Sequence, residues 1–68
     1  MQMIPVNSSN LASVGYFSST LRIQFHNGGM YEYDNVPYQV YVELMNAASK
    51  GHYFHTHIKG FYPYRRIG

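Results

Sequence analysis

Hydrophobic and polar side chains alternate along residues 21–25, in the segment Leu-Arg-Ile-Gln-Phe. A period of two is typical of a β-strand with one buried face. Residues 11–16 have moderate strand character, and residues 17–20 supply turn residues between the two strands. The sequence Asn-Gly-Gly at 27–29 favours a hairpin because asparagine and glycine tolerate positive φ. We therefore expect a third strand at residues 30–33 and an antiparallel meander.

The pattern becomes helical after Pro37, which suits the first turn of a helix because its missing N–H has no intrahelical partner there. Four apolar residues within positions 40–45 gather on one side of this helix, and two alanines extend it. Gly51 is the expected end of the helix. A second, short helix is expected from His52 to about Lys59, because aromatic, histidine and aliphatic residues repeat there at a spacing of four.

The two ends of the chain show neither period. Residues 1–9 contain Pro5 and a polar run, so we interpret them as a loosely held N-terminal arm. Residues 61–66 combine Pro63 with strand-forming tyrosines and predict an extended tail, laid over the domain or paired at a sheet edge. The predicted fold class is α+β: a three-stranded antiparallel β-meander packed with one longer and one short α-helix, with an extended C-terminal tail, in a single domain of residues 1–68.

Composition limits how such a small domain is stabilised. A chain of 68 residues buries only about 60% of its unfolded surface, and the absence of cysteine excludes disulfides, thiolate zinc sites and cysteine nucleophiles. Eight tyrosines and four phenylalanines must supply the packing, and we also expect a homo-oligomer. No apolar run approaches the roughly 18 residues of a membrane span, so the expectation is a cytoplasmic protein without a membrane partner.

The basic residues are concentrated near the C-terminus. Residues 1–49 hold one arginine and three acidic residues, whereas residues 50–68 hold two lysines and two arginines without an acidic residue. A cationic pole of this kind attracts phosphates, and it is equally consistent with a solvated tail that keeps a small protein soluble.

The sequence contains no clear motif for catalysis or metal binding. His52, His55 and His57, with His26 as a possible fourth ligand, offer nitrogens that zinc accepts. On a helix the first three would point roughly 60° to 160° apart, so we interpret them as surface histidines, one of them packed against a tyrosine. No carboxylate pair, nucleophile elbow or phosphate-binding loop is recognisable. The expectation is a protein without catalysis, metal or cofactor.

The aromatic and basic residues suit the binding of a ligand better than catalysis or metal binding. An aromatic ring beside an arginine matches a ligand that combines a flat base with a phosphate, and the pairing occurs twice. One instance lies near the C-terminus, and the other on the third predicted strand, whose two tyrosines share a face beside basic residues of the preceding strand. The competing interpretation is that tyrosines fill the core, which we favour for Tyr41 and Tyr53 on the apolar helix faces. The candidate ligand-binding residues are Tyr62, Tyr64, Arg65 and Arg66 in the first group, and Tyr31, Tyr33, Arg22 and His26 in the second.

Several short motifs occur in an order that resembles a known family. Tyr-x-Tyr at 31–33, Val-Pro at 36–37 and Tyr-Phe at 53–54 are similar to those of the KTSC domain, and the resemblance runs from about residue 8 to residue 66. This family of short domains is named for its occurrence at the C-terminus of some lysyl-tRNA synthetases, and it also forms stand-alone bacterial and phage proteins. The family typically continues Tyr-Phe with asparagine, where this chain has His55. The resemblance implies an accessory nucleic-acid binder, and no catalytic motif can be transferred.

The sequence thus predicts a non-catalytic module that binds nucleotides or RNA. Four clustered cations neutralise few phosphates, so tight binding of duplex nucleic acid by one copy is not expected. An oligomer could enclose a mono-, di- or cyclic nucleotide and act as a phage-type sponge for a nucleotide signal. The alternative is a protein–protein interaction module with an aromatic C-terminal docking surface, because tyrosine and arginine also dominate protein interfaces.

Overall fold

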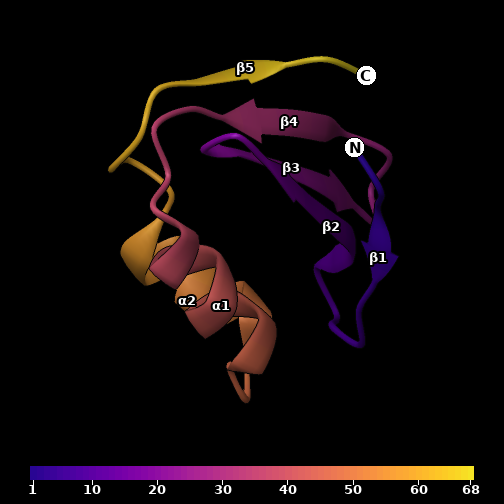
Figure 1. Ribbon diagram of the computed structural model, residues 1–68. Helices are drawn as coiled ribbons and strands as arrows, with labels where there is room; N and C mark the ends of the chain where they lie inside the picture. Colours follow the sequence, from indigo (N-terminus) through magenta and orange to yellow (C-terminus); the bar gives the residue numbers. More distant parts are fainter.

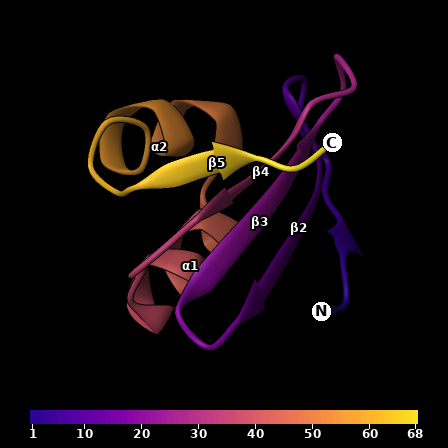
Figure 2. The same ribbon diagram turned by 90° about the horizontal axis from the view of Figure 1, so that it is seen from above.

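The computed structural model describes residues 1–68 as one antiparallel sheet with two helices against one of its faces (Figures 1 and 2). The strands lie in the order β1-β2-β3-β4-β5, so every strand pairs with its neighbours in sequence. The α+β class and the predicted meander are confirmed. The elements are β1 (Ile4–Pro5), β2 (Leu11–Phe17), β3 (Thr20–Phe25), β4 (Met30–Tyr33), α1 (Tyr38–Asn46), α2 (Lys50–His57) and β5 (Tyr64–Arg66).

The sheet has five strands, so the predicted three-stranded sheet with a C-terminal tail is wrong, although the C-terminal segment does pair at a sheet edge, one of the two placements expected for it. Both ends of the chain extend the meander: Ile4 of β1 lies opposite Val14, and Tyr64 of β5 lies opposite Tyr33. The interpretation of residues 1–9 as an arm missed β1. A proline is acceptable in β1 because this strand forms the sheet edge, where the missing N–H removes no ladder bond.

The boundary between the helices also differs from the prediction. Gly51 does not end the first helix but lies in the first turn of α2. The Ser49 hydroxyl accepts a hydrogen bond from the His52 N–H at 3.3 Å, which gives α2 an N-terminal cap before the glycine. A side chain at position 51 would place its Cβ 2.8 Å from Asn10 Nδ2, so glycine permits α2 to approach the residues before β2.

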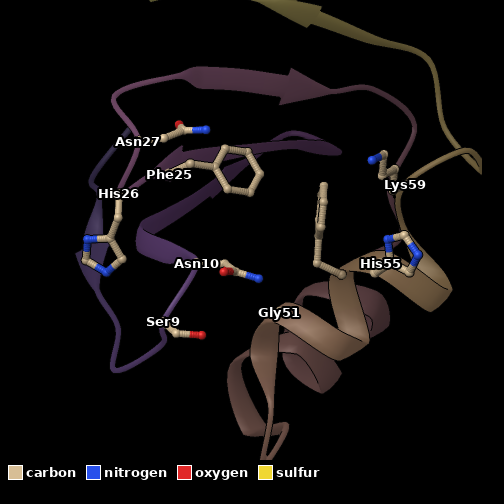
Figure 3. A pocket seen from close by; sticks show the side chains of 9 residues that line it. Ser9, Asn10, Phe25, His26, Asn27, Gly51, His55 and Lys59 are labelled. Carbon is tan, nitrogen blue, oxygen red and sulfur yellow. The ribbon is translucent and has the colours of Figure 1, made fainter.

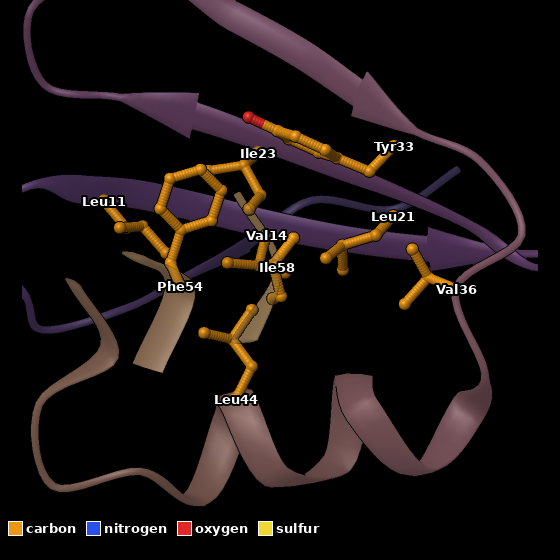
Figure 4. Packing of buried hydrophobic residues seen from close by; sticks show 9 residues of the cluster. All are labelled: Leu11, Val14, Leu21, Ile23, Tyr33, Val36, Leu44, Phe54 and Ile58. Carbon is orange, nitrogen blue, oxygen red and sulfur yellow. The ribbon is translucent and has the colours of Figure 1, made fainter. Parts of the chain in front are cut away.

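The core lies between the helices and the face of β2, β3 and β4 that they cover (Figure 4). Tyrosines at its margin satisfy their hydroxyls, as the Tyr16 hydroxyl donates to the Val36 carbonyl at 2.6 Å and its ring stacks on Tyr41 at 5.0 Å. Neither helix has the length and apolar character that crossing a membrane requires. The buried apolar residues are Leu11, Val14, Leu21, Ile23, Tyr33, Val36, Leu44, Phe54 and Ile58.

Candidate functional site

A cleft lies where helix α2 and the turn after it meet the sheet. It consists of two adjoining hollows of about 510 and 450 Å³, which we call the polar hollow and the aromatic hollow, and each has the volume of a small-ligand pocket. Phe25, Asn27, Phe54 and Lys59 line both hollows. Ser9, Asn10, His26, Gly51 and His55 complete the polar hollow, and Tyr31, Tyr33, Gly60 and Tyr64 complete the aromatic hollow.

Three tyrosines from adjacent strands form a wall of the aromatic hollow. The Tyr64 ring centroid lies 5.8 Å from that of Tyr33 and 6.1 Å from that of Tyr31. The Arg66 guanidinium lies 5.9 Å from the Tyr31 ring centroid, within the range of a cation–π contact. Tyr64 is 65% exposed, whereas burial raises the pKa of Tyr33 to about 12 and keeps its hydroxyl protonated. The wall therefore presents an accessible ring next to a cation.

Side chains that can form hydrogen bonds line the polar hollow and come from three parts of the chain (Figure 3). His55 and Lys59 come from α2 and the turn after it. His26 and Asn27 follow β3, where both side chains hydrogen-bond to backbone groups. Asn10 precedes β2 and directs its amide toward the hollow. The hollow thus combines amide and imidazole groups with one ammonium group.

The alternation of side chains along β4 and β5 separates the candidate residues into two sets. Tyr31, Tyr33, Tyr64 and Arg66 share the face of the sheet that the helices cover, and the three tyrosines line the aromatic hollow. Arg65 lies on the opposite face, although it is adjacent in sequence to two members of the set. The C-terminal residues therefore do not form one continuous surface.

Three other candidate residues also lie apart from the tyrosine wall. Arg22 pairs with Glu32 on the face opposite the tyrosines, so the predicted platform of Arg22 with the β4 tyrosines is wrong. His26 lies in the polar hollow, and its Nε2 is 3.0 Å from the Ser8 carbonyl oxygen. Tyr62 is partly buried against the core and lines neither hollow.

Arg22 and Arg65 lie on the face of the sheet that the helices do not cover, which we call the open face. They belong to an ion-pair network across β3, β4 and β5. Arg22 Nη2 lies 2.6 Å from Glu32 Oε2, and Arg65 Nη2 lies 2.6 Å from Glu32 Oε1. Arg65 also pairs with Asp34. The hydrogen bond from Arg22, assisted by the charges of both arginines, lowers the pKa of the Glu32 carboxyl although its burial opposes this effect. Two cations and two anions cancel, so this network has a structural role and leaves neither arginine available for phosphate.

We expect Glu32→Gln to lower the free energy of unfolding at pH 7 by about 1–2 kcal/mol, because it removes the negative charge that strengthens three hydrogen bonds from Arg22 and Arg65. Since folding lowers the pKa of Glu32, its contribution is fully present above the usual carboxyl value of 4.5 and is lost as the pH falls through the lower folded value. Urea titrations between pH 7 and pH 3 should show the variant approaching the wild type only in acid. Glu43→Gln removes the same charge outside the network; because hydrogen bonds from Tyr53 and Gln39 also lower the pKa of Glu43, the comparison is one of size, and the smaller change is expected in Glu43→Gln. A difference that persists unchanged at pH 3 would contradict this role.

The three histidines of α2 lie in different surroundings. The His57 ring stacks on Tyr53 with centroids 4.4 Å apart, which confirms that one histidine packs against a tyrosine. His55 lines the polar hollow, and His52 is exposed. No group of three histidine or acidic side chains is placed to hold a metal ion. Tyr53, like Tyr41, packs against the core, as predicted.

Sequence reasoning missed the residues at the centre of the cleft. The rings of Phe25 and Phe54 meet edge to face at 5.3 Å, although 28 positions separate them in the chain. Their apolar character indicated only burial. Lys59 was visible as part of the basic C-terminal segment, and its position at the end of the predicted second helix was the one available signal for a special role.

A protein-family model described as the KTSC domain matches residues 7–62, most of the chain. The chain belongs to the KTSC domain family. The crystal structure of a KTSC domain protein from Yersinia pestis has the same fold, with a TM-score of 0.94, 42% sequence identity, and coverage of 98% of this chain and 97% of that one. The resemblance recognised from the sequence motifs is confirmed.

Other proteins contain the KTSC domain in two settings. A 50-residue region is 48% identical to part of the lysine–tRNA ligases of a Nostoc species and of Trichormus variabilis, covering 74% of this chain but 9% of each ligase. The chain thus spans about a tenth of the length of these relatives. An uncharacterized protein from Stutzerimonas stutzeri is 36% identical over 70 residues, which cover 98% of this chain and 99% of that protein.

Proposed function

We propose that this KTSC domain binds nucleotides or RNA, without catalysis, in the cleft between α2 and the sheet. The observation that carries the proposal is the tyrosine wall of the aromatic hollow, with Tyr64 exposed and the Arg66 guanidinium 5.9 Å from the Tyr31 ring centroid. A stacked base contributes about 1–3 kcal/mol on such a surface, and an arginine beside the ring attracts the phosphate.

The charge distribution supports this location of the ligand. After the ion-pair network on the open face is set aside, the cations nearest the cleft are Lys59, which lines both hollows, and Arg66, which lines neither but lies over the Tyr31 ring. Neither forms an ion pair with an acidic side chain, and the Arg66 Nε donates a hydrogen bond to the Gly68 carbonyl oxygen at 2.8 Å. The likeness to a region of lysine–tRNA ligases adds support for a ligand related to RNA, because those enzymes act on tRNA. The oligomeric sponge for a nucleotide signal stays a prediction.

We expect Tyr64→Ala to weaken nucleotide binding by about tenfold, because it removes the accessible ring of the wall. Isothermal titration with mononucleotides and short oligoribonucleotides, compared with the wild type, measures this loss. Phe61→Ala is the matched control: Phe61 is 66% exposed, close to the 65% of Tyr64, but it does not line the cleft. Equal losses in the two variants, or no heat with any wild-type titration, would overturn the proposal.

A protein–protein interaction module is the second candidate. It is favoured by large apolar side chains outside the cleft near the C-terminus, where Phe61 is 66% and Ile67 is 42% exposed. In this case Phe61→Ala would abolish association with a protein partner or with a second copy, while Tyr64→Ala would have the smaller effect. The same pair of variants therefore separates the two functions.

A further inference from the structure

One cationic side chain, that of Lys59, borders both hollows of the cleft. Lys59 lines both hollows, is exposed, and takes part in none of the ion pairs of the chain. Phe25 and Phe54 also line both, so each hollow contains aromatic surface. The cleft thus has two ring-lined compartments with an ammonium group at their common boundary.

The compartments differ in what they offer beside the rings. The aromatic hollow adds Tyr31 and Tyr64, whose faces suit stacking. The polar hollow adds Asn10 and His55, whose side chains can donate and accept hydrogen bonds at the edge of a base, beside Asn27, which lines both hollows. The Asn27 Oδ1 already accepts from the Gly29 N–H at 3.1 Å, which leaves its NH2 group to donate.

The number of cations next to the cleft limits the number of ligand phosphates that the cleft can neutralise. Arg22 and Arg65 are neutralised by Glu32 and Asp34, so Lys59 and Arg66 are the cations next to the cleft. Two cations match a ligand with one or two phosphates. A long RNA strand would need a cationic track beyond them.

We propose that the ligand of the cleft is a dinucleotide, linear or cyclic, with one base in each hollow and a linking phosphate at Lys59. This inference rests on the proposed function and names the class of nucleotide. The base in the aromatic hollow stacks on the tyrosine wall, and the base in the polar hollow is recognised at its edge by the two asparagine amides. The volumes of 450 and 510 Å³ are each within the range for a small ligand.

The test compares ligands of different length on the full chain by isothermal titration. The probes are ApA, GpG, UpU and CpC, cyclic di-AMP and cyclic di-GMP, the four nucleoside monophosphates, and a twelve-residue single-stranded oligonucleotide of each base. We expect at least one dinucleotide to bind about tenfold or more tightly than its mononucleotide, because a second base is engaged. Its affinity should fall only modestly as the salt concentration rises, because a dinucleotide carries one or two phosphates, and the salt dependence of the twelve-residue strand should not be steeper.

Two variants locate the second base and the phosphate. Asn10→Ala should reduce dinucleotide binding toward the mononucleotide level, by a larger factor than it reduces mononucleotide binding. Lys59→Ala should weaken both ligand classes at least tenfold, whereas Lys50→Ala, with its ammonium bonded to the Ala47 carbonyl at 3.3 Å, should not.

Each other outcome has a defined meaning. Equal affinity for mono- and dinucleotides would overturn the dinucleotide inference and leave nucleotide binding intact. Tighter binding of the long strand with a steep salt dependence would also overturn it, in favour of an RNA tract. Absence of binding by every probe would overturn the proposed function as well.

Discussion

Phe54→Ala should lower the free energy of unfolding by about 3–5 kcal/mol, the range measured for truncation of a buried phenylalanine. The Phe54 ring is 8% exposed and meets Phe25 at 5.3 Å and Tyr33 at 5.5 Å between centroids. A domain of this length has a total stability of roughly 3–10 kcal/mol. The variant is therefore expected to be largely unfolded at 37 °C. Urea denaturation followed by circular dichroism measures the loss.

Phe61→Ala is the control for this prediction, because it removes the same side chain at a position that is 66% exposed. Its free energy of unfolding should change by no more than about 0.5 kcal/mol. A loss below about 1 kcal/mol in Phe54→Ala would show that the ring is not part of the core. The expected loss has a functional consequence: Phe54 also lines both hollows, so the cleft exists only when the core is packed.

The sheet was predictable where a local pattern exists and not at its edges. The alternation of residues 21–25 and the Asn-Gly-Gly turn identified the central hairpin. β1 and β5 have two and three residues, too few for any period to be visible. They are strands because the completed meander offers unpaired edges, as at the pairing of Tyr31 with Arg66. The strand-forming tyrosines of residues 61–66 indicated an extended segment that could pair at an edge, whereas residues 1–9 carried no such signal.

The helix boundary was misread because local propensities compete there. Two alanines favour continuation of α1, and a glycine shortly after such a run is a common helix end, so Gly51, three residues after Ala48, looked like a terminus. The structure instead places the break at Ala47, whose backbone is extended, and starts α2 at the Ser49 cap. A cap of this kind was present in the sequence, since serine is a preferred N-cap residue.

The candidate site was predictable only within single strands. The shared face of Tyr31 and Tyr33 follows from their spacing and is confirmed by the register. The same alternation places Arg22 on the face opposite Leu21 and Ile23, so its separation from the tyrosines follows from the strand pattern once the core face is known. Lys59 joins the site through the path of the chain after α2, which no local pattern encodes.

Arg65 and Arg66 lie on opposite faces of the sheet, and this placement predicts that only one of them affects nucleotide binding. We expect the double variant Lys59→Ala, Arg66→Ala to weaken nucleotide binding by a hundredfold or more, because it removes both cations that border the cleft. Each charge-assisted contact contributes about 1.5–3 kcal/mol, and two such contacts exceed the roughly 2.7 kcal/mol that corresponds to a hundredfold change. Its stability should remain within about 1 kcal/mol of the wild type, since neither side chain pairs with an acidic side chain and Arg66 loses only an exposed hydrogen bond to the Gly68 carbonyl oxygen and its contact with the Tyr31 ring.

The matched control is Arg22→Ala, Arg65→Ala, which removes the same net charge from the other face of the sheet. This variant should bind nucleotide within about threefold of the wild type at matched salt, because charges on the far face act only through screened long-range attraction. It should be less stable, since Glu32 is buried and would lose both of its arginine partners. Titration calorimetry and urea denaturation of both variants measure the two quantities. Similar losses of binding in the two variants would mean that net charge alone attracts the ligand, and the cleft would then have no specific role in its recognition.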